Sequence, residues 1–203
     1  MEKNDITFEK KIKVAFIGDM GVGKTLLFMR VNNLLNNNED YKSLNEFISQ
    51  KENLINTTKN GCLIYEKEIK LDDDKNKYKL ELWDLSNTFN TLRFNRFPIT
   101  RKFYFVEEAQ IIILCCEPRM KNTFETMKML FDISKARADT KAVYVLCITK
   151  CDLNYSEEEL KEIKKYAEDN KMELIYTSSF KDDFGLEDHI LKALMNKLNN
   201  KYK

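Results

Sequence analysis

The sequence predicts an α/β protein with a doubly wound, mostly parallel, six-stranded sheet and one antiparallel hairpin at its edge. Three observations support this fold class. Short apolar runs of strand length alternate with longer segments in which apolar residues recur at helical spacing. Two strand-like runs follow each other across a polar turn, which marks the hairpin. Three of the five glycines lie within six residues, between the first strand-like run and the first helical one.

The N-terminal half begins with an apolar strand over residues 11–17 and a helix over 24–35. Strands over 62–71 and 77–84 form the hairpin, because the aspartates and asparagine between them favour a turn. The connection over 32–60 is rich in asparagine and charge, and its apolar positions suit a short amphipathic helix. A connection this long often carries function, although an insertion without a function is equally compatible with this composition.

The C-terminal half continues the alternation of strands and helices. The runs 109–116 and 142–148 are almost entirely apolar, as expected of parallel strands buried on both faces. The serine and glutamates of 156–159 form a capping-box signature that begins a helix. The remaining elements are expected as helices over 121–138 and 185–199 and a short strand over 172–177.

Composition excludes several classes of function. The 203 residues are expected to form a single domain, 1–203, with a long asparagine-rich insertion around 32–60. The 34 basic and 33 acidic residues nearly cancel, which argues against nucleic acid as a partner. The chain has no membrane-spanning run and no glycine or cysteine placed for lipidation, so no direct membrane anchor is expected. The five cysteines form no C-x-x-C pair and are expected to be reduced, as in a cytoplasmic protein.

The glycine cluster has the pattern G-x-x-x-x-G-K-T, from Gly18 to Thr25. Between a strand and a helix, such a loop points successive backbone N–H groups at a phosphate, and the helix dipole adds to the attraction. Lys24 would reach the β- and γ-phosphates, and the Thr25 hydroxyl would ligate Mg²⁺. A glycine-rich turn without a ligand is the alternative, but it does not need a Lys-Thr pair at its end.

Three further segments suit a nucleoside triphosphate. Asp84 ends an apolar strand, where a carboxylate can hold the water shell of Mg²⁺. In the loop 149–153, the Asp152 carboxylate can accept hydrogen bonds from the N1–H and the exocyclic amine of guanine, a donor pair that adenine lacks. The Lys150 stem can lie along the base. The segment 177–180 follows the next strand, where backbone N–H groups could meet the guanine O6.

The segments GDMGVGKT, WDLSN, TKCDL and TSSF, with Thr57 and Thr58 between the first two, resemble the small GTPases of the Ras superfamily. The resemblance covers roughly residues 10–200, and IGDMGVGKT and LELWD are most similar to the Rab branch. It implies the P-loop NTPase fold of small G proteins and binding of GTP or GDP with Mg²⁺. It also implies a nucleotide-dependent switch assisted by exchange factors and GTPase-activating proteins.

The resemblance also implies roles for individual residues. Lys24 and Thr58 would act in catalysis, with Thr58 preferred over Thr57 as the switch I threonine. The metal ligands would be Thr25, Thr58 and Asp84. The phosphates would be bound by Gly18, Asp19, Met20, Gly21, Val22, Gly23, Lys24, Thr25, Leu26 and Asn87. The guanine would be bound by Thr149, Lys150, Asp152, Leu153, Ser178, Ser179 and Phe180.

Five positions depart from the family pattern. Thr88 stands where the family has the glutamine that orients the attacking water, and its side chain is too short for that task. Asn87 replaces a glycine whose N–H senses the γ-phosphate, a contact that asparagine can retain. Met20 replaces a small residue and could crowd an incoming arginine finger. Thr149 replaces the commoner asparagine, and Phe180 replaces the usual lysine.

Together these features predict a Rab-like GTP/GDP-binding switch with slow intrinsic hydrolysis, acting in vesicle or intracellular transport. Effectors and regulators are expected to bind residues 50–60 and 84–105. The protein is expected to be a cytoplasmic monomer or subunit of a complex, recruited to membranes by its partners. One alternative is a pseudo-GTPase, a nucleotide-bound scaffold subunit without productive hydrolysis. Another is an ATP-using P-loop enzyme, against which Asp152 argues.

Overall fold

The structure is a computed structural model, and it describes most of the sheet and the helices that cover it. The described residues are 9–32, 56–57, 62–70, 77–85 and 105–179, with Leu194, Met195, Lys197, Leu198 and Asn200. The strands are β1 (Glu9–Gly18), β2 (Asn56–Thr57), β3 (Leu63–Lys70), β4 (Lys77–Asp84), β5 (Ile111–Cys116), β6 (Val143–Ile148) and β7 (Glu173–Tyr176). The helices are α1 (Lys24–Val31), α4 (Lys121–Lys135) and α5 (Glu157–Asp169).

The described strands form one sheet in the order β2-β3-β4-β1-β5-β6-β7. β1 pairs in parallel with β4 and β5, and the parallel pairing continues through β6 to β7. β3 runs antiparallel to β4 and forms the hairpin near one edge. The predicted fold class is therefore confirmed, and each of the six predicted strands is present. The two-residue strand β2 adds a seventh, which the sequence analysis did not predict.

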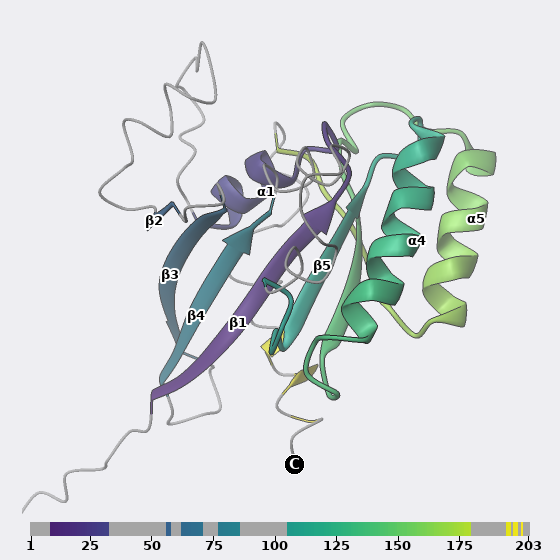
Figure 1. Ribbon diagram of the computed structural model, residues 1–203. Coiled ribbons are helices and arrows are strands. Elements are labelled where there is room, and N and C mark those ends of the chain that lie inside the picture. Colours follow the sequence, from purple (N-terminus) through teal and green to yellow (C-terminus); the bar gives the residue numbers. More distant parts are fainter. Residues whose placement is uncertain are drawn as a thin grey trace, which may run out of the picture.

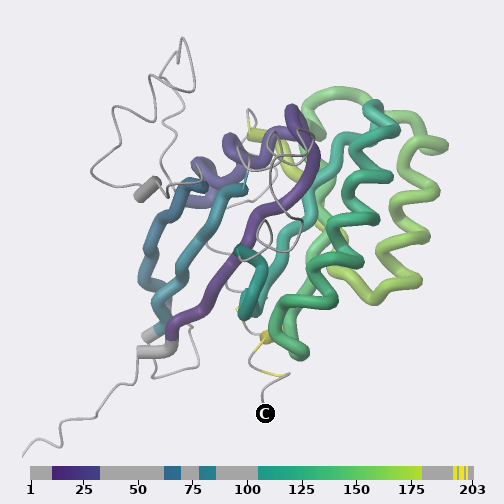
Figure 2. The backbone as a smooth tube through the Cα atoms, in the orientation of Figure 1, coloured from purple at the N-terminus to yellow at the C-terminus, as the bar shows by residue number. Residues whose placement is uncertain are grey.

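β1 lies at the centre of the sheet and supplies side chains to two cores (Figures 1 and 2). Because alternate residues of a strand face opposite sides, Ile12, Val14 and Phe16 join the core beneath α1, and Ala15 and Ile17 join the core beneath α4 and α5. Figure 1 shows α4 and α5 side by side on their face of the sheet. Helices therefore cover both faces, as a doubly wound sheet requires.

The predicted helix boundaries are close to the observed ones. The helix expected over 24–35 is described as far as Val31, with Asn32 at its C-cap, and the helix expected over 121–138 ends at Lys135. The capping box of α5 is present, since the Ser156 hydroxyl accepts a hydrogen bond from Glu159 N at 3.2 Å. Within the last predicted helix, Leu194 and Leu198 are buried in the core beneath α1. The amphipathic segment predicted within 32–60 lies outside the described residues, apart from Asn32 and β2.

Gly18 is required at the end of β1 because the neighbouring strand is very close. A Cβ atom built on Gly18 would lie 2.4 Å from the backbone oxygen of Cys115 in β5. No side chain fits at that distance, so the tight junction between the two strands depends on glycine.

The substitution Gly18→Ala is expected to lower the free energy of unfolding by roughly 3 kcal/mol, because β1 and β5 would have to separate locally. Gly21→Ala is the matched control. Gly21 has a left-handed φ of 78°, but nothing lies within 4 Å of a Cβ at that position. Only backbone strain remains there, which costs about 1 kcal/mol. Urea unfolding of both variants measures the difference, and equal losses would contradict the steric argument.

Candidate functional site

The predicted site residues gather at one edge of the sheet, where the parallel strands end. The glycine loop follows β1, Asp84 ends β4, the loop 149–153 follows β6, and the loop 177–179 follows β7. Ligands of doubly wound sheets bind beyond the carboxyl ends of their strands. The topology thus brings together segments that are more than one hundred residues apart in the sequence.

The loop between β1 and α1 presents the start of the helix without a side-chain cap. Gly21 and Gly23 have left-handed φ values of 78° and 92°. Gly23 is the N-cap of α1, and no side chain among the described residues caps that end. The first turn of α1 holds no acidic residue either. A helix start of this kind attracts an anion, because its N–H groups and its dipole are directed toward the ligand.

Lys24 is a buried cation at the base of this loop. It is 2% exposed, and its Nζ donates a hydrogen bond to the backbone oxygen of Asp19 at 2.5 Å. Burial lowers the pKa of Lys24, and the nearby Asp84 carboxylate is the largest influence in the opposite direction. Asp84 is fully buried and Thr25 is 8% exposed. Lys24 and the two expected metal ligands, Thr25 and Asp84, are therefore all buried.

Asp19 fastens the glycine loop to helix α4. One carboxylate oxygen accepts a hydrogen bond from Met20 N at 2.7 Å, and the other accepts one from the Thr126 hydroxyl at 3.1 Å. The Met20 side chain, by contrast, is 52% exposed on the loop. The backbone of this loop is therefore supported from α4, while its largest side chain projects into solvent.

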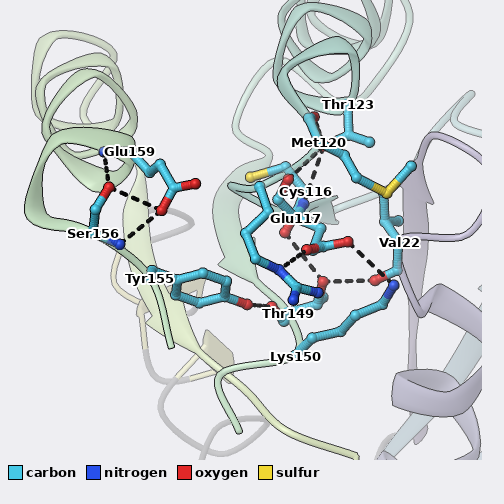
Figure 3. A network of polar contacts seen from close by, with 11 residues as sticks. Val22, Cys116, Glu117, Met120, Thr123, Thr149, Lys150, Tyr155, Ser156 and Glu159 are labelled. Carbon is cyan, nitrogen blue, oxygen red and sulfur yellow. Dashed lines mark hydrogen bonds and ion pairs between the residues drawn. The ribbon is translucent and has the colours of Figure 1, made fainter. Parts of the chain in front are cut away.

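Thr149 joins the loop after β6 to the glycine loop (Figure 3). Its hydroxyl lies 2.6 Å from the backbone oxygen of Val22 and 3.1 Å from that of Cys116. Its own backbone oxygen accepts a hydrogen bond from the Tyr155 hydroxyl. Threonine at this position thus makes a direct connection between two loops of the site.

Lys150 lies across the glycine loop. Its backbone is in the left-handed region, with φ 59°. Its Cε is 3.9 Å from the position that a Cβ on Gly23 would take, and its Nζ donates to Glu117 Oε2 at 3.2 Å. That the Lys150 stem lies along a bound base stays a prediction.

Asp152 connects to the loop after β7. Its Oδ1 accepts a hydrogen bond from the Ser178 hydroxyl at 2.8 Å, and Cys151 N donates to the backbone oxygen of Thr177 at 2.9 Å. The Arg30 guanidinium donates to the backbone oxygen of Ser179 at 3.4 Å, which links this loop to α1. The two loops expected to bind guanine therefore form one hydrogen-bonded unit.

Fewer contacts are described for the remaining predicted site residues. Leu26 lies in α1 and Leu153 in the loop after β6, both half-buried. Thr57 lies in β2, opposite Leu63 of β3. The other predicted residues, Thr58, Asn87, Thr88 and Phe180, lie outside the described residues.

Glu117, Thr126 and Tyr155 also contact these loops and were not predicted from the sequence. Glu117 directly follows the buried strand β5, and the same signal, a carboxylate at the end of an apolar strand, had singled out Asp84. That signal could have found Glu117. Thr126 donates a hydrogen bond to Asp19, which is 107 residues away, and Tyr155 donates one to the backbone oxygen of Thr149, and no sequence pattern marks either residue.

The glycine loop, the buried Lys24 and the paired loops after β6 and β7 define a P-loop nucleotide-binding protein. The chain matches the Ras family over residues 13–199, and it therefore belongs to that family. Members bind GTP and GDP, generally with Mg²⁺, and act as GTP-binding switches that contact effectors and regulators. No curated protein matches the chain. Among the helices that the structure describes, none is long and apolar enough to cross a bilayer.

The Thr149 hydroxyl gives the first test of the site. Thr149→Val keeps the shape of the side chain but removes the donor to the buried Val22 oxygen. The free energy of unfolding is expected to fall by about 1–3 kcal/mol, the cost of an unsatisfied buried group. Thr149→Ser retains the hydroxyl and is expected to lose less than about 1 kcal/mol. Equal losses in chemical unfolding would show that packing of the methyl group, and not the hydrogen bond, joins the loops.

Proposed function

We propose that the protein is a Rab-like GTP/GDP-binding switch with slow intrinsic hydrolysis that acts in vesicle or intracellular transport. Membership of the Ras family supports guanine-nucleotide-dependent switching in general. The observation that carries the proposal is the 2.6 Å hydrogen bond from the Thr149 hydroxyl to the Val22 backbone oxygen. It aligns the loop expected to read the base with the loop expected to hold the phosphates.

The residues present fit a nucleotide with Mg²⁺. Gly21 has open space where a side chain would otherwise stand, and its left-handed backbone suits a loop that curves around an anion. The Thr25 hydroxyl and the Asp84 carboxylate are hard oxygen donors of the kind that Mg²⁺ prefers, and both are buried. These two residues would hold the ion, with Thr58 as a third ligand. When bound, Mg²⁺ neutralises charge on the β- and γ-phosphates.

The protein's own side chains would orient the nucleotide from both ends. Lys24 would bind the β- and γ-phosphates from the base of the loop. Asp152 would accept hydrogen bonds from the guanine edge, and Ser178 already orients this carboxylate through its Oδ1 atom. Arranging these groups before binding reduces the entropy that the complex must lose.

Slow hydrolysis is proposed from three residues that, by the family resemblance, would act at the γ-phosphate. Thr88 is too short to orient the attacking water as the family's glutamine does, and Asn87 replaces the neighbouring glycine. Met20 places an exposed thioether on the phosphate loop, where an arginine finger would approach. Loss of water positioning and of the finger can each lower the rate by orders of magnitude.

The transport role is proposed from the likeness of IGDMGVGKT and LELWD to the Rab branch. Effectors and regulators would bind residues 50–60 and 84–105. Recruitment to membranes would come from such partners, with the protein otherwise in the cytoplasm as a monomer or as a subunit of a complex.

GTP hydrolysis under single-turnover conditions with Mg²⁺ tests the catalytic part of the proposal. The rate is expected at or below about 10⁻⁴ s⁻¹, the scale of unassisted hydrolysis in this family. Thr88→Gln restores the longer amide and is expected to raise the rate, whereas Thr88→Val is expected to leave it unchanged. Unassisted turnover of the natural protein above about 10⁻² s⁻¹ would contradict slow hydrolysis.

A pseudo-GTPase scaffold is the second candidate, favoured by the same replacements at Asn87 and Thr88. A switch is expected to change the hydrogen-exchange protection of residues 50–60 and 84–105 between the GDP form and the form bound to a non-hydrolysable GTP analogue. Exchange across the unchanged strand β6 provides the internal control. Identical protection of both segments in the two forms would favour the scaffold over the switch.

A further inference from the structure

Glu117 is a buried carboxylate beside the loop expected to bind guanine (Figure 3). It directly follows β5, and its side chain is 2% exposed. Its Oε1 accepts a hydrogen bond from Arg119 Nε at 2.6 Å, and its Oε2 accepts one from Lys150 Nζ at 3.2 Å. Because an ionised carboxylate is costly to bury alone, these two cations are what make its burial tolerable.

The two cations differ in what they connect to. Arg119 lies two residues from Glu117 in the same turn, and its side chain is 41% exposed. Lys150 comes from the loop after β6, and its stem passes over Gly23 of the phosphate loop. The contact with Lys150 therefore links Glu117 to the loop expected to bind guanine, whereas the contact with Arg119 stays within the turn that contains Glu117.

The backbone of Glu117 is firmly held. The hydroxyl of Thr123, in the first turn of α4, lies 3.2 Å from Glu117 N and 3.0 Å from Glu117 O. Met120 N donates to the same Glu117 oxygen at 3.0 Å. Thr123 itself is 1% exposed. The carboxylate is thus presented from a fixed turn between β5 and α4.

The contact between Lys150 Nζ and Glu117 restricts a lysine side chain that would otherwise have many conformations. A free lysine loses considerable rotamer entropy when it is ordered, and a group ordered before binding spares the complex that cost. Lys150 is anchored at both ends, since its backbone is next to Thr149 and its ammonium is paired with Glu117. The stem between these two points has few paths other than the one across the glycine loop.

We propose that Glu117 is a positioning residue for nucleotide binding, which holds the Lys150 ammonium so that the lysine stem lies in place along the purine base. By this contact Glu117 slows the release of GDP. The inference rests on the proposed function, because it requires that a guanine nucleotide occupies the site.

The dissociation rate of a fluorescent GDP analogue tests the inference. Glu117→Gln keeps the size of the side chain but removes its charge, and it is expected to speed dissociation about tenfold, the effect of weakening one charge-assisted hydrogen bond. Arg119→Gln is the matched control, since it removes the other partner of the same carboxylate. It is expected to change the GDP dissociation rate by less than about twofold, because the contact between Glu117 and Lys150 remains, whereas any cost of leaving the buried carboxylate with one partner fewer affects the free energy of unfolding.

A double variant separates positioning from a general loss of structure. If Glu117 acts through Lys150, adding Glu117→Gln to Lys150→Gln is expected to have no further effect on the dissociation rate. If Glu117→Gln alone does not fold, Glu117→Asp, which keeps the charge but shortens its reach toward Lys150, is measured in its place and is expected to speed dissociation, and an unchanged rate would overturn the inference. A rate for Glu117→Gln within twofold of the natural protein, or an additional tenfold effect in the double variant, would overturn the inference. Failure of the natural protein to bind GDP would instead overturn the proposed function beneath it.

Discussion

The hydrogen bond between the Thr149 hydroxyl and the Val22 backbone oxygen is the contact on which the arrangement of the site depends. β6, which Thr149 follows, is separated from β1 by β5, so no strand pairing joins their loops directly. The hydroxyl bridges that gap, at 2.6 Å from Val22 O, and it also lies 3.1 Å from Cys116 O at the end of β5. The glycine loop, the end of β5 and the loop after β6 thus share one buried proton donor. Displacement of either loop would break this hydrogen bond. It would also leave a buried acceptor unpaired, which adds a further cost in free energy.

The sheet gives this junction a rigid base. β1 contributes side chains to both cores, and at Gly18 it approaches Cys115 too closely for any side chain. Around that base, α4 supports the phosphate loop through Thr126 and Asp19, and the turn before α4 supports Lys150 through Glu117. Helix α4 and the turn before it thereby support two loops, the one expected to hold the phosphates and the one expected to bind the base.

Local patterns were sufficient to predict most of the fold. Apolar runs predicted the six long strands, and the Ser156 capping box predicted the start of α5, since both depend on neighbouring residues in the chain. The phosphate loop and Asp152 were singled out because fixed spacing links their residues to one chemistry, and their binding roles stay predictions. Glu117, Thr126 and Tyr155 were missed for different reasons. A carboxylate directly after an apolar strand could have marked Glu117, whereas Thr126 and Tyr155 each make a single side-chain hydrogen bond that no periodic pattern reveals. The assignments of Thr58, Asn87, Thr88 and Phe180 stay predictions, since these residues lie outside the described part of the chain.

The loops that would hold the phosphates and the base are well connected, whereas the residues expected to promote cleavage depart from the family pattern at Asn87 and Thr88. The central claim is therefore that this site retains a guanine nucleotide. Its most direct test is the identity of the nucleotide released when the purified protein is denatured, measured by chromatography against standards. The account predicts nearly one guanine nucleotide for each protein, with an appreciable share of GTP. Release of adenine nucleotide, or an empty protein with no affinity for GDP, would contradict it.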